Sequence, residues 1–204
     1  MSKRLRCVTC LKALSACICN TIKQLDNQYF LHILQDPSEH KKAIGTAKIL
    51  SLSLLRVKIS TATHFNEQDF DLNNCFLVFP GEDAILAEKL SPQYKVDQYS
   101  QFILLDGSWK KAHKLLMNNP FLLKLPKVSF SIYQKSAYRI RKSPREDGLS
   151  TVEAGYYLLS QLENSETKYQ PLLESFNAMI DYQIQRMPSG LYEKNYLQGE
   201  SECR

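Results

Sequence analysis

The chain has 204 residues, of which 44% are hydrophobic and 23% charged, a balance that is ordinary for a soluble globular protein with one main domain. No apolar run approaches the roughly 20 residues of a membrane span. The basic start, MSKRLRCVTC, is not followed by the apolar segment of a secretory signal, so a cytoplasmic location is expected. The formal net charge of +5 is too small to identify a partner by itself.

The first twenty residues hold four cysteines in the spacing C-x2-C-x6-C-x-C: Cys7, Cys10, Cys17 and Cys19. Four thiolates this close in sequence suit a tetrahedral Zn²⁺ ion, and a reducing cytoplasm disfavours disulfides. With four sulfur ligands the ion has no open coordination position, so its role would be structural or RNA-contacting and not catalytic. Unliganded cysteines and an iron–sulfur centre are the alternatives.

Near-continuous apolar runs predict four strands, over residues 29–35, 75–79, 101–105 and 127–132. Helices are predicted over residues 37–55, 82–90, 108–117, 150–162 and 170–187. This alternation predicts an α/β fold with a mostly parallel sheet. We expect three parts: a zinc-binding segment over 1–24, the main domain over 25–190 and a polar tail over 191–204.

Three of these helices carry start signals. Asp36 precedes Pro37 and is followed three residues later by Glu39, and Ser150 is followed three residues later by Glu153. Both pairs have the spacing of a capping box. The segment 82–90, EDAILAEKL, has its acids first and its lysine last, which suits the helix dipole.

Three strand ends carry polar or turn residues, in QDPSE, FPGED and LDGSW. Ligands of parallel sheets bind beyond the carboxyl ends of the strands, so these segments should meet at one rim. Gly107 allows backbone to approach a ligand closely. Asp106 suits proton acceptance or the binding of an amine or hydroxyl, and Trp109 suits stacking on a base. Alternatively, Asp106 or Ser108 caps the next helix while Trp109 packs in the core.

The segment 138–144, YRIRKSP, presents Arg139 and Arg141 at alternating positions, where both can bind a phosphate or carboxylate. The start of the Ser150 helix offers backbone N–H groups to an anion. Residues 124–145 hold seven basic residues and no acid, which would attract a polyanion or form a solvated face. No P-loop or G-x-G-x-x-G pattern occurs, which disfavours nucleoside triphosphates and dinucleotides. The four histidines show no metal-ligand spacing, and His40 is the nearest to the rim.

Taken together, these segments resemble the DTW-domain family of tRNA-uridine aminocarboxypropyltransferases. The matching pieces follow the family's order over residues 7–155: the cysteine cluster, LQDPSEHKKAIGTAKILSLSL, VFPGED, LLDGSWKKAHKL, YRIRKSP and LSTVEA. The family's signature is Asp-x-Thr-Trp, and this chain keeps the hydroxyl with Ser108 in place of threonine. It has Asp36-Pro37 where the family commonly has His-Pro.

The resemblance implies a SPOUT-like fold with a C-terminal trefoil knot, and S-adenosylmethionine as donor of its 3-amino-3-carboxypropyl group to N3 of a tRNA uridine. Methylthioadenosine would be the by-product. Asp106 would be the base or would hold the donor's amino group, and Trp109 would stack on the base or form a wall of the pocket. Arg139, Arg141 or the start of the Ser150 helix would anchor the donor's carboxylate. The implied donor-binding residues are Pro80, Gly81, Leu105, Gly107, Ser108, Arg141, Leu149, Ser150 and Thr151.

The expected partner is tRNA, bound through the basic run and the cysteine segment. No protein partner is evident, and the expected assembly is a monomer or a homodimer. Two other functions stay open at this point. A SPOUT-type RNA methyltransferase would use the same fold and donor but transfer the methyl carbon. A zinc-dependent RNA-binding module would bind RNA without catalysis.

Overall fold

A computed structural model describes residues 5–40, 42, 45–90, 96–133, 136, 139–140, 148–192 and 195 of the chain. Its centre is a six-stranded sheet in the order β2-β1-β5-β3-β6-β4, in which every paired strand is parallel to its neighbour. The predicted α/β class with a mostly parallel sheet is therefore confirmed.

The three central strands are buried on both faces, which explains their continuous apolar sequences. They are β1 (Phe30–Gln35), β5 (Gln101–Asp106) and β3 (Cys75–Val78). The outer strands are β2 (Val57–Thr61), β6 (Lys127–Ser129) and β4 (Ile85–Leu86).

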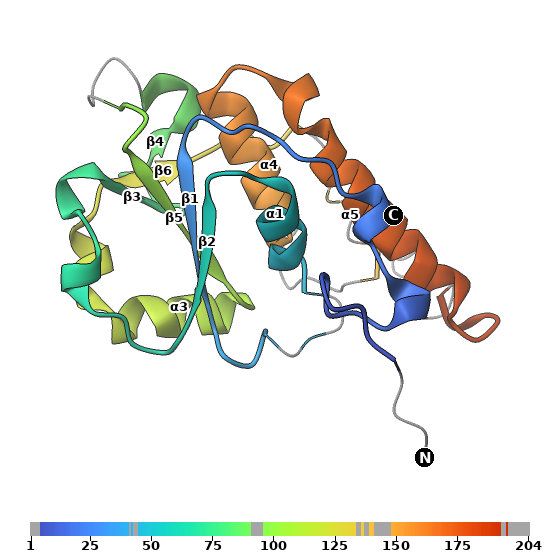
Figure 1. Cartoon of the computed structure of the whole chain (residues 1–204). Helices are drawn as coiled ribbons and strands as arrows, with labels where there is room; N and C mark the ends of the chain where they lie inside the picture. Colours follow the sequence, from blue (N-terminus) through green and yellow to red (C-terminus); the bar gives the residue numbers. More distant parts are fainter. Residues whose placement is uncertain are drawn as a thin grey trace, which may run out of the picture.

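The helices lie on both faces of the sheet (Figure 1). On one face lie α1 (Ala47–Ser53), α4 (Thr151–Leu162) and α5 (Glu166–Gln185). On the other lies α3 (Trp109–Asn118), followed by a 3-10 helix at Pro120–Lys124. Shorter 3-10 helices occur at Leu14–Ala16, Cys19–Thr21, Glu67–Asp69, Leu72–Asn74 and Ala87–Lys89.

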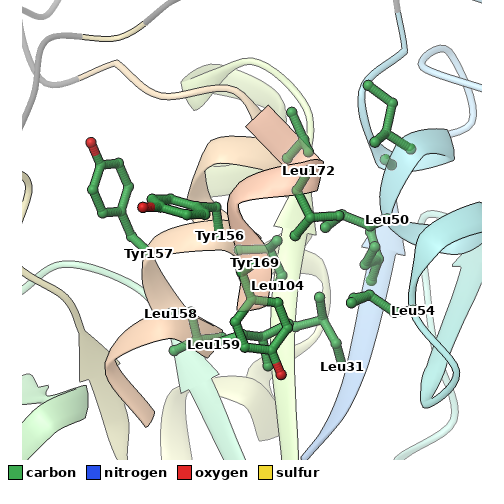
Figure 2. Packing of buried hydrophobic residues seen from close by; sticks show 14 of the residues in the cluster. Leu31, Leu50, Leu54, Leu104, Tyr156, Tyr157, Leu158, Leu159, Tyr169 and Leu172 are labelled. Carbon is green, nitrogen blue, oxygen red and sulfur yellow. The ribbon is translucent and has the colours of Figure 1, made fainter. Parts of the chain in front are cut away.

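The larger core lies between the sheet and the α1–α4–α5 layer. Figure 2 shows Leu50 of α1, Leu159 of α4 and Leu172 of α5 gathered with Leu31 and Leu104 of the sheet. The cysteine segment joins this core through Cys10 and Ile18, both buried. Its end is tied to α5, because the Ser175 hydroxyl donates a hydrogen bond to the Thr21 carbonyl oxygen over 2.6 Å.

One predicted helix, over 37–55, is confirmed only in its second half, and the helix predicted over 82–90 is wrong. Residues 37–40 form turns, and α1 begins only at Ala47. The Asp36 carboxylate accepts a hydrogen bond from the Ser38 N–H over 2.9 Å, which makes a local turn instead of a helix cap. Residues 82–90 contain β4 and a 3-10 helix, because Ile85 and Leu86 pair with β6 and extend the sheet.

The strand predictions need two further corrections. The strand β2 was not predicted, because the prediction relied on continuous apolar runs. This edge strand is only partly buried and has Lys58 and Ser60 between its apolar residues. The strand predicted over 127–132 ends at Ser129. The helices predicted over 108–117 and 150–162 are confirmed, and the last is shifted to Glu166–Gln185.

Close packing of α4 on α1 fixes where the first residues of α4 lie, and Gly155 makes that packing possible. A Cβ atom at Gly155 would lie 2.7 Å and 2.9 Å from the two methyl carbons of Leu50, which is fully buried. We expect Gly155→Ala to lower the free energy of unfolding by about 1 kcal/mol. Overpacking costs roughly 1–3 kcal/mol, which exceeds the gain of up to about 1 kcal/mol in helix propensity.

Chemical denaturation measures this effect, and Gly155→Val should cost more. In the Leu50→Ala background the cost of Gly155→Ala should shrink, because the clashing methyl groups are gone. A stabilising Gly155→Ala substitution in the wild-type background would contradict this packing.

Candidate active site

The predicted convergence of strand ends is present. The strands β1, β5 and β3 are neighbours in the sheet, so their carboxyl ends share one edge. Gln35 at the end of β1 lies opposite Asp106 at the end of β5. Beyond β3 the chain continues through Phe79 and Pro80 to the same edge, which we call the rim.

Asp106 is buried at the rim and joins three elements. Its Oδ2 accepts a hydrogen bond from Gln35 Nε2 over 2.7 Å, and its Oδ1 accepts one from the hydroxyl of Thr151, the first residue of α4. Gln35 is itself oriented, because its Oε1 accepts a hydrogen bond from the Thr61 hydroxyl over 3.2 Å. This network holds β1, β5 and α4 at fixed relative positions.

Burial raises the pKa of Asp106 above its ordinary value near 3.8, and the hydrogen bonds from Thr151 and Gln35 offset part of the rise. Asp106 is only 6% exposed. The carboxylate therefore takes up a proton more readily than a solvent-exposed aspartate would.

A cavity of about 270 Å³ opens at the rim beside Asp106, between the ends of β3, β5 and β6 and the starts of α3 and α4. Its wall is mostly apolar, with Ser129 and Thr151 as its hydroxyl-bearing residues. The lining residues are Val78, Phe79, Pro80, Leu104, Leu105, Gly107, Trp109, Ala112, Val128, Ser129, Phe130, Ile132, Leu149, Thr151 and Ala154. Such a cavity suits a small molecule with a large apolar surface.

Six of the predicted residues meet in this wall: Pro80, Leu105, Gly107, Trp109, Leu149 and Thr151. The absence of a side chain matters at Gly107, since a Cβ atom there would lie 2.9 Å from the Lys111 Cβ. Asp106 is not itself a lining residue. It lies behind the wall and positions Thr151 within it.

The remaining predicted residues lie elsewhere. Ser108 is the N-cap residue of α3, without a hydrogen bond from its side chain to the helix. Ser150 is buried in the predicted capping box, which is confirmed: its hydroxyl accepts from the Glu153 N–H, and its N–H donates to the Glu153 carboxylate over 2.7 Å. Arg139 is half exposed and pairs with Asp181 of α5. Arg141 lies outside the described residues.

A polar cluster borders the rim at the residues after β1. Glu39 is nearly buried, and its Oε1 lies 2.8 Å from the Nζ atoms of both Lys42 and Lys111. Burial alone would raise the pKa of Glu39, but the hydrogen bonds from these two lysines outweigh it and lower the pKa. Lys111 also donates to the Ser38 hydroxyl over 2.6 Å, which ties α3 to the turn after β1.

A second, open cleft of about 470 Å³ adjoins the cavity. It is lined by Phe79, Pro80, Gly81, Trp109 and His113, of which the first two and Trp109 also line the cavity. The rings of Phe79 and Trp109 meet edge to face, with centroids 6.0 Å apart. Trp109 therefore stands between the two hollows.

Several residues of the site escaped the sequence analysis. Gln35 and Thr61 orient Asp106, while Phe79 and His113 line the second cleft. The position of His113 four residues after Trp109, on the same face of a predicted helix, is a signal that could have found it. His40, the histidine singled out from the sequence, is exposed in the turns after β1.

The four N-terminal cysteines form a cluster that suits a metal ion. The Sγ atoms of Cys7, Cys10, Cys17 and Cys19 all lie within 4.8 Å of one another. The Cys7–Cys19 and Cys10–Cys17 sulfur distances are 3.6 Å and 3.8 Å. A tetrahedron with metal–sulfur bonds of about 2.3 Å has sulfurs about 3.8 Å apart, so the cluster fits such an ion.

Backbone groups prepare one of these sulfurs for a metal. Hydrogen bonds from the backbone of Cys10 and Thr9 lower the pKa of Cys7 to about 6. The thiolate, and not the thiol, is the form that binds a metal. The turn is closed by the Leu11 N–H, which donates to the Cys7 carbonyl oxygen over 2.9 Å.

The described members of the basic run 124–145 have acidic partners. Lys124 lies 3.7 Å from Glu67, and Lys127 lies 2.8 Å from Asp83, as measured between the Nζ and carboxylate oxygen atoms. Arg139 pairs with Asp181, as described above. The other four basic residues of the run lie outside the described residues: Lys135, Arg141, Lys142 and Arg145.

No helix in the described part of the chain has the length and apolar character that a membrane crossing requires.

The family model described as "DTW domain" matches residues 4–184. The chain is 29% identical to tRNA-uridine aminocarboxypropyltransferase 2 of Mus musculus over 210 residues, covering 96% of this chain and 69% of that protein. It is 27% identical to the protein of the same name from Drosophila melanogaster over 197 residues, covering 90% and 76%. No solved structure matches the chain significantly.

The raised pKa of Asp106 predicts a pH-dependent effect of Asp106→Asn on stability. In the wild type the ionised, buried carboxylate disfavours the folded state at neutral pH. Protonation relieves this cost as the pH falls through the raised pKa, and the cost is gone below the ordinary value near 3.8. The free energy of unfolding of the wild type should therefore rise relative to that of Asp106→Asn between pH 7 and pH about 4.

Urea denaturation at several pH values measures the difference. The exposed Asp97, near the amino end of β5, offers Asp97→Asn as a matched control for the loss of a carboxylate. A difference between wild type and Asp106→Asn that stays constant with pH would contradict the raised pKa.

Proposed function

Because the chain belongs to the DTW-domain family, we propose that it transfers the 3-amino-3-carboxypropyl group of S-adenosylmethionine to N3 of a tRNA uridine. Its relatives are named for this class of transfer. One observation of the structure carries the proposal: the Asp106–Trp109 segment borders an apolar cavity at the carboxyl ends of parallel strands, where such sheets bind ligands.

The cavity suits the donor. Its apolar wall fits the adenine ring and the thioether carbons, while backbone groups near Pro80, Leu105 and Leu149 offer hydrogen bonds to the adenosine. Gly107 lines the cavity, and its lack of a side chain lets α3 pack close to the end of β5. Thr151, at the start of α4, adds the positive end of a helix dipole for the donor's carboxylate.

Asp106 acts in this proposal from behind the cavity wall. Both of its carboxylate oxygens are already acceptors, and each retains a lone pair. As a buried carboxylate it favours positive charge in the cavity, such as the donor's ammonium group. We therefore assign Asp106 to holding Thr151 and the donor, in preference to direct removal of the uridine proton.

The reaction needs positioning more than covalent help from the protein. Bound S-adenosylmethionine supplies a γ-carbon already activated by its positive sulfur. Uridine N3 releases its proton to solvent and its electron pair forms the new bond to that carbon. The carbon–sulfur bond breaks with its electron pair going to the sulfur, so methylthioadenosine leaves as a neutral thioether. What the chain must provide is alignment of N3 with the γ-carbon instead of the methyl carbon, which a rigid rim and a fixed donor achieve.

The finer fold assignment is part of the same proposal. We place the chain among SPOUT-like proteins with a knotted C-terminal half, in which Phe130, Ile132 and Leu149 would help to enclose the donor. Arg141, which lies outside the described residues, is proposed as a donor-binding residue. Arg139, engaged with Asp181, would have to exchange this partner to reach the donor.

The cysteine cluster is proposed to hold one Zn²⁺ ion with a structural role. We expect elemental analysis of the purified chain to find about one zinc per molecule, because four sulfurs at these separations fit a closed tetrahedral site. The Cys10→Ser/Cys17→Ser variant should lose the metal. Cys75→Ser, which alters a buried cysteine outside the cluster, is the matched control and should retain it. Full zinc content in the double variant would overturn the assignment.

Nucleoside mass spectrometry of tRNA tests the function itself. Purified protein, unmodified tRNA and S-adenosylmethionine should yield a uridine heavier by one aminocarboxypropyl group. The Asp106→Asn variant should form it at least about 100-fold more slowly, since the donor is no longer held in place. Asp97→Asn is again the control.

The outcomes separate the competing functions. A uridine that gains one methyl group would identify a methyltransferase. Unchanged tRNA with the wild-type protein, together with tight tRNA binding, would identify a non-catalytic RNA-binding module.

A further inference from the structure

The open cleft beside the donor cavity has the features of a second binding site. The two hollows share Phe79, Pro80 and Trp109, so ligands in both would meet across the Trp109 ring. On α3, Ala112 lines the cavity and the next residue, His113, lines the cleft. One turn of one helix thus contributes to both sites.

The helix that borders the cleft is basic. Over its ten residues α3 carries three lysines, one histidine and no acid. Lys111 is paired with Glu39, which also pairs with Lys42. Lys110 and Lys114 are exposed, and neither has a carboxylate oxygen within 4.0 Å in the described part of the chain; the charge of Lys114 acts at longer range on Asp36 and helps to lower its pKa. Lys110 lies three residues before His113 and four residues before Lys114, so it shares an exposed face of α3 with both of them.

This arrangement contrasts with the basic run 124–145. There Lys124, Lys127 and Arg139 are all paired with acids. The exposed cations of α3 therefore provide a less compensated positive charge beside the cleft, and this charge attracts phosphates.

We propose that the cleft receives the acceptor nucleobase: an unpaired pyrimidine of an RNA loop stacks on Trp109 with its polar edge toward His113. The phosphates on either side of that nucleotide bind Lys110 and Lys114. This proposal rests on the proposed function, because it places the acceptor beside the proposed donor cavity. It adds the surface that recognises RNA and the residues that read the base.

The chemistry of the cleft favours the nucleobase over the donor as occupant. A base that belongs to a polymer needs a site open to solvent, and Pro80, Gly81 and His113 are all exposed. Stacking on an aromatic ring is how single-stranded RNA is commonly held. His113 adds ring nitrogens that can donate to or accept from the base edge. Trp109, shared by both hollows, brings the base next to the donor.

Steady-state kinetics with purified tRNA and S-adenosylmethionine tests the proposal. His113→Ala should raise KM for tRNA by about 5- to 150-fold, the range of one lost base contact, while KM for the donor stays within about twofold. Ala154→Leu, which fills the donor cavity, should raise KM for the donor and leave KM for tRNA nearly unchanged.

Binding measurements at several salt concentrations test the phosphate contacts. Lys110→Gln/Lys114→Gln should reduce the slope of log affinity against log salt by about 2. The matched control is Lys58→Gln, an exposed lysine at the start of β2, at the opposite end of the sheet from the rim. This control should leave both the slope and KM unchanged.

The outcomes distinguish a failure of this site from a failure of the proposed function. In one outcome the wild type transfers the group, but the KM for tRNA of His113→Ala and of the double lysine variant equals that of the wild type. The proposed acceptor site is then wrong, and the proposed function stands. If His113→Ala raises KM for the donor instead, the cleft belongs to the donor. If the wild type transfers nothing and tRNA binding still depends on Lys110 and Lys114, the RNA surface stands and the transfer is wrong.

Discussion

A single buried carboxylate ties the candidate site together. Asp106 ends the central strand, and its two oxygens accept hydrogen bonds from β1, through Gln35, and from α4, through Thr151. A charged group costs free energy to bury unless it is hydrogen-bonded, so these partners cannot move independently of it. The start of α4 and the ends of the strands therefore form one rigid frame around the cavity.

Everything that the proposed chemistry needs is attached to this frame. Thr151 projects from it into the cavity, and Gly107 and Trp109 follow Asp106 directly in the chain. The chemical difference between transfer of a methyl group and transfer of the aminocarboxypropyl group lies in which carbon meets the nucleophile. A frame with little freedom is suited to that choice, and in the proposed arrangement the Trp109 ring lies between donor and acceptor.

The central strands and the rim were predictable because burial on both faces leaves an uninterrupted apolar sequence, and parallel strands bring their ends together. The Ser150–Glu153 capping box was predictable because the two residues act locally. The similar pattern at Asp36 gave a wrong prediction of a helix start, because the Asp36 side chain accepts a hydrogen bond from the Ser38 N–H and forms a turn. The β4 strand depends on pairing with β6, a distant segment. Gln35 and Phe79 gain their roles only from neighbours far away in sequence.

Isotopic labelling of the donor tests the central claim most directly. The wild-type protein is incubated with unmodified tRNA and S-adenosylmethionine carrying one isotope in the aminocarboxypropyl chain and another in the methyl group. The account predicts that the chain label enters the tRNA uridine while the methyl label leaves with methylthioadenosine. Methyl label in the tRNA, with the chain label left on the small-molecule product, would contradict it.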